Sequence, residues 1–496
     1  MLGVFRRAVS ALFLSTILLV NAISHAEVKT YVGEGSYTMS DVETLEIARE
    51  QAKADAIQNA REKAIVDVRS YLRSKNVAAD EDLIETITKN ILKLVEEPNF
   101  YPPEKVDNEG NVLIRVTVKA QIDDSDIMRW RNKDYKRIAI LIAQTKAMRK
   151  ENEKQNQQLA ELKEELAHNP NKKKLVQKFE AFGKKFLSNQ KVEKAWQLYD
   201  KDDYNSAINL CNEALSLNPN NALAYFGRGT AYYELKQYDQ AIQDYDKAIE
   251  LNPNDAYAYY NRGLAYDELG QHERAIQDYD KAIELNPKYS DAYSNRGIAY
   301  DELGQHERAI QDYDKAIKLN PNDDYAYSNR GIAYAYLGQN DRAIQDYDKA
   351  IQLNPNFDKA YYNRGIVYHD LGQYERAIQD YDKAIELNPN DADAYNNRGL
   401  AYHDLGQHER AIQDYNKAIE LNPNDADAYN IRGEAYYDLK DYKQALADLN
   451  KSIELGISGK DLGEVLYYRG LCYQATGNNA KAKADFAKAK ELGYTE

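Results

Sequence analysis

Cysteine is nearly absent from this chain, which has two in 496 residues, Cys211 and Cys472. A disulfide framework needs an even set of cysteines at short, regular spacings. Both residues fall at helix positions predicted to face the interior of a helical hairpin, where a thiol serves as a small apolar group. We therefore interpret both as packing residues, not as a disulfide or a nucleophile.

The motifs of common catalytic centres are missing too. The sequence contains no Gly-x-Ser-x-Gly turn, no glycine loop of the Walker type and no His-Glu-x-x-His pair. Repeats as alike as those described below also offer no unique pocket. We predict that the protein is not an enzyme and uses no cofactor.

Positive charge is in deficit, with 65 Lys and Arg residues against 80 Asp and Glu residues and a formal net charge of −15. Non-specific binding to nucleic acid depends on clustered Lys and Arg side chains. This balance argues against nucleic acid as a partner.

Long hydrophobic runs are scarce, and the clearest lies at the N-terminus. Arg6 and Arg7 precede an apolar run over 8–20, and Ser24 and Ala26 provide small residues before a cut at Glu27. This pattern predicts a secretory signal peptide over 1–26, with an uncleaved anchor as the alternative. No cysteine follows the run for lipid attachment. We expect an exported protein, periplasmic or envelope-associated, that meets a membrane only through a partner.

What the sequence does have is a repeat in its second half. The dipeptide Arg-Gly recurs every 34 residues from 228/229 to 432/433, and once more, 37 residues later, at 469/470. A fixed step of this size predicts stacked supersecondary units, each buried on its neighbours. A chain of this length then needs no single large core.

Each unit encodes two helices. In the unit 256–289, an apolar helical stripe ends near Gly270, where a glycine can close a helix in the left-handed conformation. A second stripe over 275–285 is stopped by Pro287, which lacks the amide that a continuing helix needs. Small residues on both stripes allow close approach of the backbones, so the unit predicts a helical hairpin.

The order of residues within a unit resembles the tetratricopeptide repeat. In the unit starting at 222 the matching positions 4, 8, 11, 20, 24, 27 and 32 hold Tyr225, Gly229, Tyr232, Ala241, Tyr245, Ala248 and Pro253. Nine units start at 188, 222, 256, 290, 324, 358, 392, 426 and 463. The resemblance implies a mainly α fold, a right-handed α-solenoid over 188–496. The two end units depart from the pattern and are expected to be caps.

A small α+β domain is predicted over 27–124. Strands are expected at 28–32 and 112–122, a helix with alanine at every fourth residue from Ala48 to Ala64, and a second helix from Asp80 through Val95. The segment more weakly resembles the N-terminal modules of flagellar T-type and small lipoprotein-type envelope proteins. That resemblance implies an envelope setting and no site.

A long helix is predicted over 125–168, followed by a linker helix over 169–187. A seven-residue apolar pattern over 138–166 favours a coiled coil, although the polar Asn152 and Gln155 fall in its seam. One interpretation is a homodimerising stalk. The other is a single spacer helix docked on the first domain.

The tetratricopeptide architecture implies that the first helices line a concave groove. Position 6 is asparagine in five successive units, a row that resembles the asparagine ladder of the O-linked N-acetylglucosamine transferase superhelix: Asn261, Asn295, Asn329, Asn363 and Asn397. Amides both donate and accept, so this row could pair with the backbone of an extended peptide. No transferase domain follows, so that activity is not implied.

The alternative interpretation of the asparagine row is that asparagine was copied with the repeat by duplication. Groove tyrosines are predicted at Tyr260, Tyr325 and Tyr362.

Acidic residues dominate the predicted groove. They fall at positions 12, 13 and 2, and include Asp267, Glu268, Asp301, Glu302, Asp370, Asp404, Asp438, Asp291, Asp393 and Asp427. Only Lys359 opposes them at position 2. The Lys and Arg clamp that holds a terminal carboxylate in some relatives is missing. A neutral or basic, extended polypeptide is the expected partner.

Two further sets of side chains have structural interpretations. A partly buried guanidinium needs a partner, so the arginines at position 7 are predicted to pair with the aspartates at position 23: Arg262, Arg296, Arg330, Arg364 and Arg398 with Asp278, Asp312, Asp346, Asp380 and Asp414. His369 and His403 lie in adjacent units, too far apart to share a zinc ion, and His272, His306 and His408 are expected to pack in the turn. No metal site is predicted.

The sequence thus favours an exported scaffold that binds an extended polypeptide or assembly partner in its concave groove. A second hypothesis is an accessory subunit of a cell-envelope machine, in which the N-terminal domain binds and the repeats act as a spacer. A third is a glycan-binding solenoid, because Tyr, Asn and Asp on a groove also suit sugars.

Overall fold

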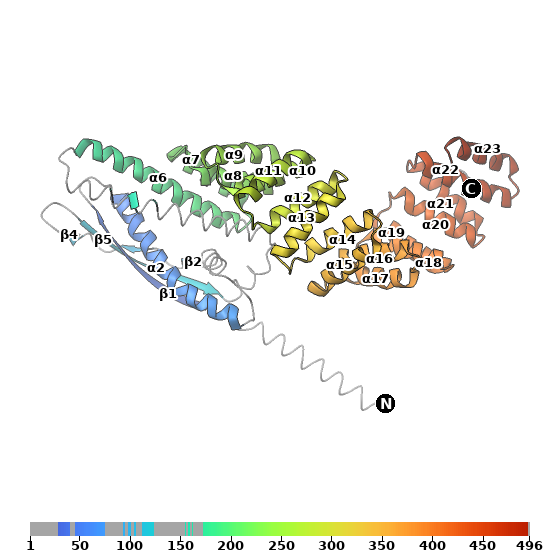
Figure 1. Ribbon diagram of the computed structural model, residues 1–496, viewed down its shortest axis with the longest axis horizontal. Coiled ribbons are helices and arrows are strands. Elements are labelled where there is room, and N and C mark those ends of the chain that lie inside the picture. Colours follow the sequence, from blue (N-terminus) through green and yellow to red (C-terminus); the bar gives the residue numbers. More distant parts are fainter. Residues whose placement is uncertain are drawn as a thin grey trace, which may run out of the picture. The chain divides into compact units, whose positions relative to one another are not determined.

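The structure is a computed structural model that describes residues 28–39, 45–74, 93–94, 98–100, 104–105, 112–123, 154, 157–158, 161 and 172–494. It divides into two units, residues 1–271 and 272–496, and each unit is described by itself. Figure 1 shows the elements with their labels. The predicted signal peptide and most of the predicted coiled coil lie outside the described residues.

The first unit begins with an antiparallel sheet. Strand β1 (Val28–Met39) pairs along its whole length with β5 (Val112–Asp123), from Val28 opposite Asp123 to Met39 opposite Val112. Three short strands pair with the other edge of β5: β2 (Lys93–Leu94), β3 (Asn99–Phe100) and β4 (Glu104–Lys105). Both predicted strands are present, and β1 continues beyond the predicted 28–32 to Met39. Leu94, predicted in the second helix, lies instead on β2, because its backbone pairs with Ala120 of β5.

Helix α2 (Leu45–Ser74) packs on this sheet. Its alanine stripe, predicted from the four-residue spacing, is fully buried at Ala52, Ala56, Ala60 and Ala64. The helix also covers the outer edge of β1: Asn59 and Lys63 donate to the carbonyl oxygens of Glu34 and Val32 at 2.6 and 2.7 Å. An edge strand with unpaired backbone groups invites pairing with another chain. These side chains occupy part of that edge.

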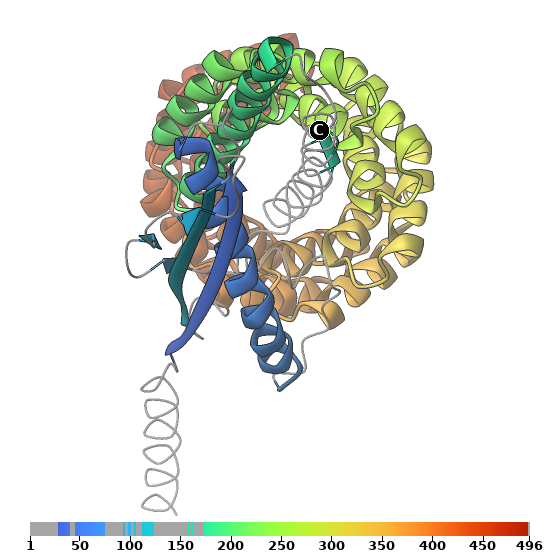
Figure 2. The same cartoon turned by 90° about the vertical axis from the view of Figure 1, so that its left-hand side faces the viewer.

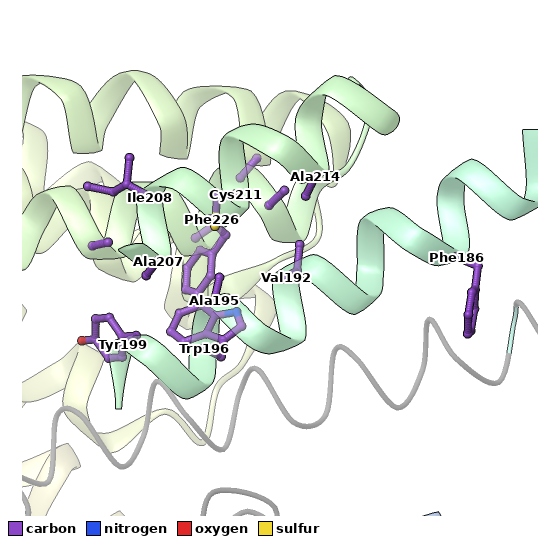
Figure 3. Close-up of a cluster of buried hydrophobic side chains, with 14 of the residues drawn as sticks. Phe186, Val192, Ala195, Trp196, Tyr199, Ala207, Ile208, Cys211, Ala214 and Phe226 are labelled. Atoms are coloured by element: carbon purple, nitrogen blue, oxygen red, sulfur yellow. The ribbon is translucent and has the colours of Figure 1, made fainter. Parts of the chain in front are cut away.

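Within residues 172–271 the first unit contains α6 (Lys172–Tyr199), α7 (Tyr204–Leu217), α8 (Ala222–Glu234), α9 (Tyr238–Leu251) and α10 (Ala256–Glu268). The predicted linker helix and the first helix of the first repeat are a single continuous helix, α6. Figure 3 shows Trp196 and Tyr199 near its end, beside Phe226 of α8 and Ala207 of α7, in a buried cluster that includes Cys211. The ring centroids of Trp196 and Phe226 lie 6.2 Å apart. Arg61 of α2 pairs with Glu193 of α6 at 3.4 Å, which connects the N-terminal domain to the first repeat.

The second unit is a succession of antiparallel helices. They are α11 (His272–Leu285), α12 (Ser290–Glu302), α13 (His306–Leu319), α14 (Asp324–Tyr336), α15 (Asn340–Leu353), α16 (Asp358–Asp370), α17 (Tyr374–Leu387), α18 (Ala392–Asp404), α19 (His408–Leu421), α20 (Ala426–Asp438), α21 (Tyr442–Glu454), α22 (Gly459–Ala475) and α23 (Asn479–Glu491). These boundaries confirm the predicted two helices per repeat. Within the described ranges, no helix combines the length and apolarity needed to span a membrane.

Glycine and alanine set the spacing within each hairpin. Gly406, in the turn between α18 and α19, has φ +70°, the left-handed conformation predicted for the helix end. A Cβ added to Gly399 on α18 would lie 2.6 Å from Cε1 of Tyr415 on α19, so glycine is required for the tyrosine ring to lie there. Ala411 and Ala418 on the facing helix are buried. The repeated spacing of small residues in the pattern is therefore a packing requirement.

The hairpins of the second unit stack on a curved path, visible in Figure 2. Successive first helices approach one another, α12 with α14, α14 with α16, α16 with α18, and α18 with α20. Successive second helices among α13 to α21 do not approach one another to the same extent. The stack therefore curves with its first helices on the inner side.

An arginine at position 7 links each hairpin to its neighbour. Arg330 donates from Nε and Nη2 to both carboxylate oxygens of Asp346 at 2.7 and 2.6 Å, and from Nη1 to Asp314 of the preceding hairpin at 2.5 Å. Its guanidinium also lies 5.5 Å from the ring centroid of Tyr327 and 5.8 Å from that of Tyr334. Burial lowers and the paired aspartates raise the pKa of Arg330, with a net upward shift. The guanidinium is therefore held charged by both hairpins.

The same contacts recur along the stack. The predicted pairs with position 23 are confirmed for Arg296, Arg330, Arg364 and Arg398. The predicted pair of Arg262 with Asp278 spans the two units and stays a prediction. Arg262 does contact Asp246 of the preceding repeat at 2.5 Å. The link to the preceding hairpin was not predicted.

Replacing Arg330 by Met should destabilise this part of the stack by about 3 kcal/mol, because the substitution leaves the buried Asp346 carboxylate without its cation. Denaturant unfolding of the full chain, together with hydrogen exchange of α13 to α15, measures the loss. Lys383→Ala is the control, since Lys383 forms only an exposed pair with Glu386. Equal stability of both variants would contradict a bridging role for the arginine.

Candidate functional site

The candidate site is the surface carried by the first helices of the hairpins, here called the inner face. In the second unit it is formed by α12, α14, α16, α18, α20 and α22 (Figure 2). The asparagines at position 6, the acidic residues at positions 2, 12 and 13, and three tyrosines were predicted to lie on it. The structure gives these positions different degrees of exposure.

The asparagines of position 6 do not form a uniformly exposed row. Asn261 and Asn295 are buried, and their Nδ2 groups donate to the carbonyl oxygens of Tyr257 and Asp291, one turn earlier, at 2.8 and 2.9 Å. Asn397 donates in the same way to Asp393. Asn329 and Asn363 are partly exposed and make no hydrogen bond within the described residues. These two amides remain able to bind a peptide backbone.

The predicted tyrosines also separate into two groups. Tyr260 is buried, with 2 % of its surface exposed, and cannot contact a partner without moving. Tyr325 is 62 % exposed, with its ring 4.8 Å from that of Phe357. Tyr362 is partly buried and accepts a hydrogen bond from Asn397 of the next hairpin at 3.0 Å. Burial, followed by Asp393 and Asp391, raises the pKa of Tyr362 to about 12.

The predicted acidic residues also differ from one another in how far they are exposed. Asp301 is mostly buried, pairs with His306 Nδ1 at 3.0 Å and accepts a hydrogen bond from Tyr313 at 2.8 Å. Burial raises the pKa of Asp301. Asp301 is therefore part of the packing within its hairpin. Asp267, in the first unit, is partly buried.

Two acidic residues at position 2 are more accessible. Asp393 and Asp427 are exposed at the starts of α18 and α20, and no ion pair involves either one in the described part of the chain. Burial, followed by nearby carboxylates including Asp425, raises the pKa of both. A group of neighbouring carboxylates creates a local negative potential, which favours a cationic ligand.

Glu434 is a residue that sequence reasoning missed. It occupies position 9 of its repeat, where the five preceding repeats have Leu or Ile. Burial, followed by the Glu464 carboxylate, raises the pKa of Glu434 to about 8. Its Oε1 and the hydroxyl of Tyr415 are buried without a hydrogen-bond partner among the described residues. The sequence alone could have identified Glu434, because it places a carboxylate at a position that is apolar in the five preceding repeats.

Several histidines lie beside the turns that join the two helices of a hairpin. His369 Nε2 lies 2.9 Å from Asp404 Oδ2 of the next hairpin, and His403 Nε2 lies 2.8 Å from Asp438 Oδ2 of the one after. Sequence reasoning considered His369 together with His403. It missed the contact of His403 with His408, whose rings are 4.8 Å apart, because the two positions flank a turn.

Both cysteines are buried and free. Burial raises the pKa of the Cys211 thiol to about 12 and that of Cys472 to about 11. A thiol held protonated in this way is a poor nucleophile. Their environment fits the predicted packing role.

Replacing Glu434 by Leu should stabilise the protein in a pH-dependent way. Between pH 4.5, the ordinary pKa, and about 8, the unfolded chain releases a proton that the folded chain keeps, so the stability of the natural protein falls with rising pH. At pH 8 or above the variant should gain on the order of 2 kcal/mol, and the gain should shrink towards pH 4.5. Unfolding at a series of pH values measures this. A gain that does not change with pH, or one equalled by the exposed control Glu420→Leu, would refute it.

Comparison with known families supports the repeat assignment. Family models described as TPR repeat match residues 196–236, 229–270, 333–372 and 365–406. Models described as tetratricopeptide repeat match 256–289, 290–323 and 392–425, then 312–345 and 414–447, and finally 464–492. Together the matches extend over 196–447 and 464–492. No curated protein matches the chain.

Solved structures similar to the chain include two that are described as tetratricopeptide repeat proteins. A tetratricopeptide repeat protein from Parabacteroides merdae is 25% identical with a TM-score of 0.42, and the match covers 50% of this chain and 98% of that one. MamA from Desulfovibrio magneticus is 30% identical over 34% of this chain and 94% of that one, with a TM-score of 0.32. YrrB, a TPR protein described as having an unusual peptide-binding site, is 26% identical over 40% and 97%, with a TM-score of 0.33. The family matches cover more than half of the sequence, and the chain belongs to the tetratricopeptide repeat family.

Proposed function

We propose that this protein is an exported, non-catalytic scaffold whose inner face binds an extended polypeptide of neutral or basic character. Tetratricopeptide repeats generally bind proteins or peptides, and the proposal specifies the face, the chemistry and the charge. The uncompensated carboxylates of Asp393 and Asp427 are the observation that carries it.

The charge argument starts from the arginines. In the second unit the position 7 guanidiniums bind the aspartate at position 23 of their own repeat and an aspartate or asparagine at position 25 of the preceding one, as in Arg330 and Arg432. These partners all lie on second helices, so the arginines do not neutralise the inner face. Asp393 and Asp427 repeat at a 34-residue step on successive first helices. A chain with Lys or Arg side chains at matching intervals would lower the electrostatic free energy of both carboxylates.

Groups for binding a backbone occur on neighbouring first helices. Tyr325 on α14 offers a largely exposed ring, and Asn329 lies one turn later on the same helix. Asn363 repeats that amide on α16. An aromatic surface with uncommitted amides suits an extended chain, whose carbonyl and amide groups remain unpaired in solution.

The location in the cell rests on the sequence alone. The N-terminal arginines, apolar run and small residues over 1–26 support export to the periplasm or cell envelope. The apolar seven-residue pattern over 138–166 supports a homodimer, in which two solenoids would bind a partner together.

Asp393→Asn combined with Asp427→Asn should weaken binding of a lysine- and serine-rich unstructured peptide roughly fivefold at low salt. The loss arises because two unpaired charges are removed from the inner face. Fluorescence anisotropy with the full chain measures the affinity, and added salt should weaken binding to the natural protein.

Glu386→Gln combined with Glu420→Gln is the matched control for that experiment. Both glutamates are exposed on second helices in pairs with lysines, so the same change in net charge should leave affinity nearly unaltered. Equal losses in both double variants would mean that only overall charge matters, and would overturn the assignment to the inner face.

Asn329→Ala combined with Asn363→Ala should weaken binding both of this peptide and of its lysine-to-glutamine counterpart, by about threefold each. The amides are proposed to bind the backbone, so the loss should not depend on side-chain charge. Asn261→Ala provides the comparison, since that amide is buried. Unchanged affinity of the Asn329 and Asn363 variant for both peptides would remove the amides from the proposed site.

A further inference from the structure

We propose that His403, His408 and Asp438 form a binding site for a divalent transition-metal ion of the Zn²⁺ type. The site joins one hairpin to the next and does not depend on the proposed function. It differs from the zinc site considered for His369 and His403, whose imidazoles lie in separate repeats.

The fold brings the three residues together from three helices. His403 lies in the last turn of α18, His408 opens α19, and Asp438 ends α20 of the following hairpin. Only Leu405, Gly406 and Gln407 connect α18 to α19, and the left-handed Gly406 turns the chain sharply enough for the two imidazoles to meet. Their rings are 4.8 Å apart at an interplanar angle of 66°.

The distances fit a metal site with small adjustments. One ligand atom of each residue lies within 4.8 Å of the other two. Asp438 Oδ2 is 2.8 Å from His403 Nε2 and 4.0 Å from His408 Nδ1. Tetrahedral zinc with bonds of about 2.0–2.1 Å holds its ligand atoms about 3.3 Å apart. The observed separations bracket this value, so rotations of the side chains would suffice.

One imidazole nitrogen is left without a partner. Nδ1 of His408 is buried and makes no hydrogen bond within the described residues, while His403 is satisfied by Asp438. A buried polar atom without a partner destabilises the folded state. A metal ion between this nitrogen, His403 and Asp438 would satisfy all three groups.

The ligand chemistry selects the class of ion. Two imidazoles and one carboxylate suit Zn²⁺ and related borderline metals better than Ca²⁺ or Mg²⁺, which prefer all-oxygen sites. The carboxylate also offsets part of the charge of the ion. Asp438 is about one-third exposed, so a fourth position open to solvent can be filled by water or by a side chain of a partner.

The other hairpins of the second unit provide internal comparisons. The site uses positions 12 and 17 of one repeat and position 13 of the next. In the preceding repeat these three positions, here called a column, hold His369, Tyr374 and Asp404, so a tyrosine replaces the second imidazole. In the repeat starting at 290 the column holds Asp301, His306 and Tyr336, and the last two rings stack 4.8 Å apart. Among these columns, one alone combines two histidines with a carboxylate.

The experiment uses the untagged full chain, treated with a chelator and then desalted. Isothermal titration calorimetry with Zn²⁺ and the visible absorption of bound Co²⁺ report binding, and the melting temperature reports stabilisation. The natural protein should bind more metal, by one equivalent, than His408→Tyr does. That variant reproduces the His, Tyr and Asp set of the preceding repeat and should therefore fold. Zn²⁺ should raise the melting temperature of the natural protein and not that of the variant.

A second variant tests the site by gain of binding. Tyr374→His gives the preceding column the same three ligands, and should add one equivalent of Zn²⁺ to the natural stoichiometry. Equal Zn²⁺ binding by the natural protein and His408→Tyr would overturn the proposal, as would a natural protein whose Co²⁺ spectrum shows no nitrogen-ligated species.

Discussion

Each hairpin in the described stack depends on a guanidinium that two neighbours share. The position 7 arginine binds the position 23 aspartate of its own repeat through two hydrogen bonds and reaches an aspartate or asparagine of the preceding repeat with its third nitrogen, as in Arg398 with Asp414 and Asp382. A planar, permanently charged fork can satisfy both partners at fixed angles, which lysine cannot. The contact fixes the two helices of a hairpin against each other and sets the distance to the next hairpin. The curvature of the inner face therefore follows from a polar contact as well as from the packing of Gly, Ala and Tyr.

This arrangement separates the charges of the repeat. Aspartates on second helices are paired with arginine, whereas Asp393 and Asp427 on first helices form no ion pair among the described residues. Each has its pKa raised by burial and then by other nearby carboxylates, Asp391 and Asp425 for Asp393, and Asp425 and Asp461 for Asp427. The inner face thus combines unpaired carboxylates, two uncommitted amides and an exposed tyrosine, all carried on rigid helices. Specific binding by repeat proteins uses this kind of periodic surface, because an extended guest presents its own groups at regular intervals.

Much of the fold follows from the sequence because the repeat is so regular. Helix ends were predictable from Gly270 and Pro287, and the pairing of Arg330 with Asp346 from the need of a buried guanidinium for an anion. Contacts between repeats were harder, since Asp314 becomes a neighbour of Arg330 only once the stack has its curvature. The exposure of the asparagines also could not be read from their spacing: Asn261 and Asn295 turn back to their own helices. Leu94 has the spacing of a helix face yet pairs with β5, because strand pairing over a long distance in sequence outweighs local pattern.

The central claim is that an extended polypeptide lies along the first helices of the stack. It is tested most directly by placing a photo-crosslinking amino acid at Tyr325 on α14 and, in a separate protein, at Glu386 on the second helix α17, and irradiating the full chain in intact cells. Mass spectrometry then identifies what each position contacts. The account predicts that position 325 crosslinks to a defined segment of one partner, rich in neutral or basic residues, and that position 386 does not. Crosslinks to the same partner at equal yield from both positions, or only from position 386, would contradict it.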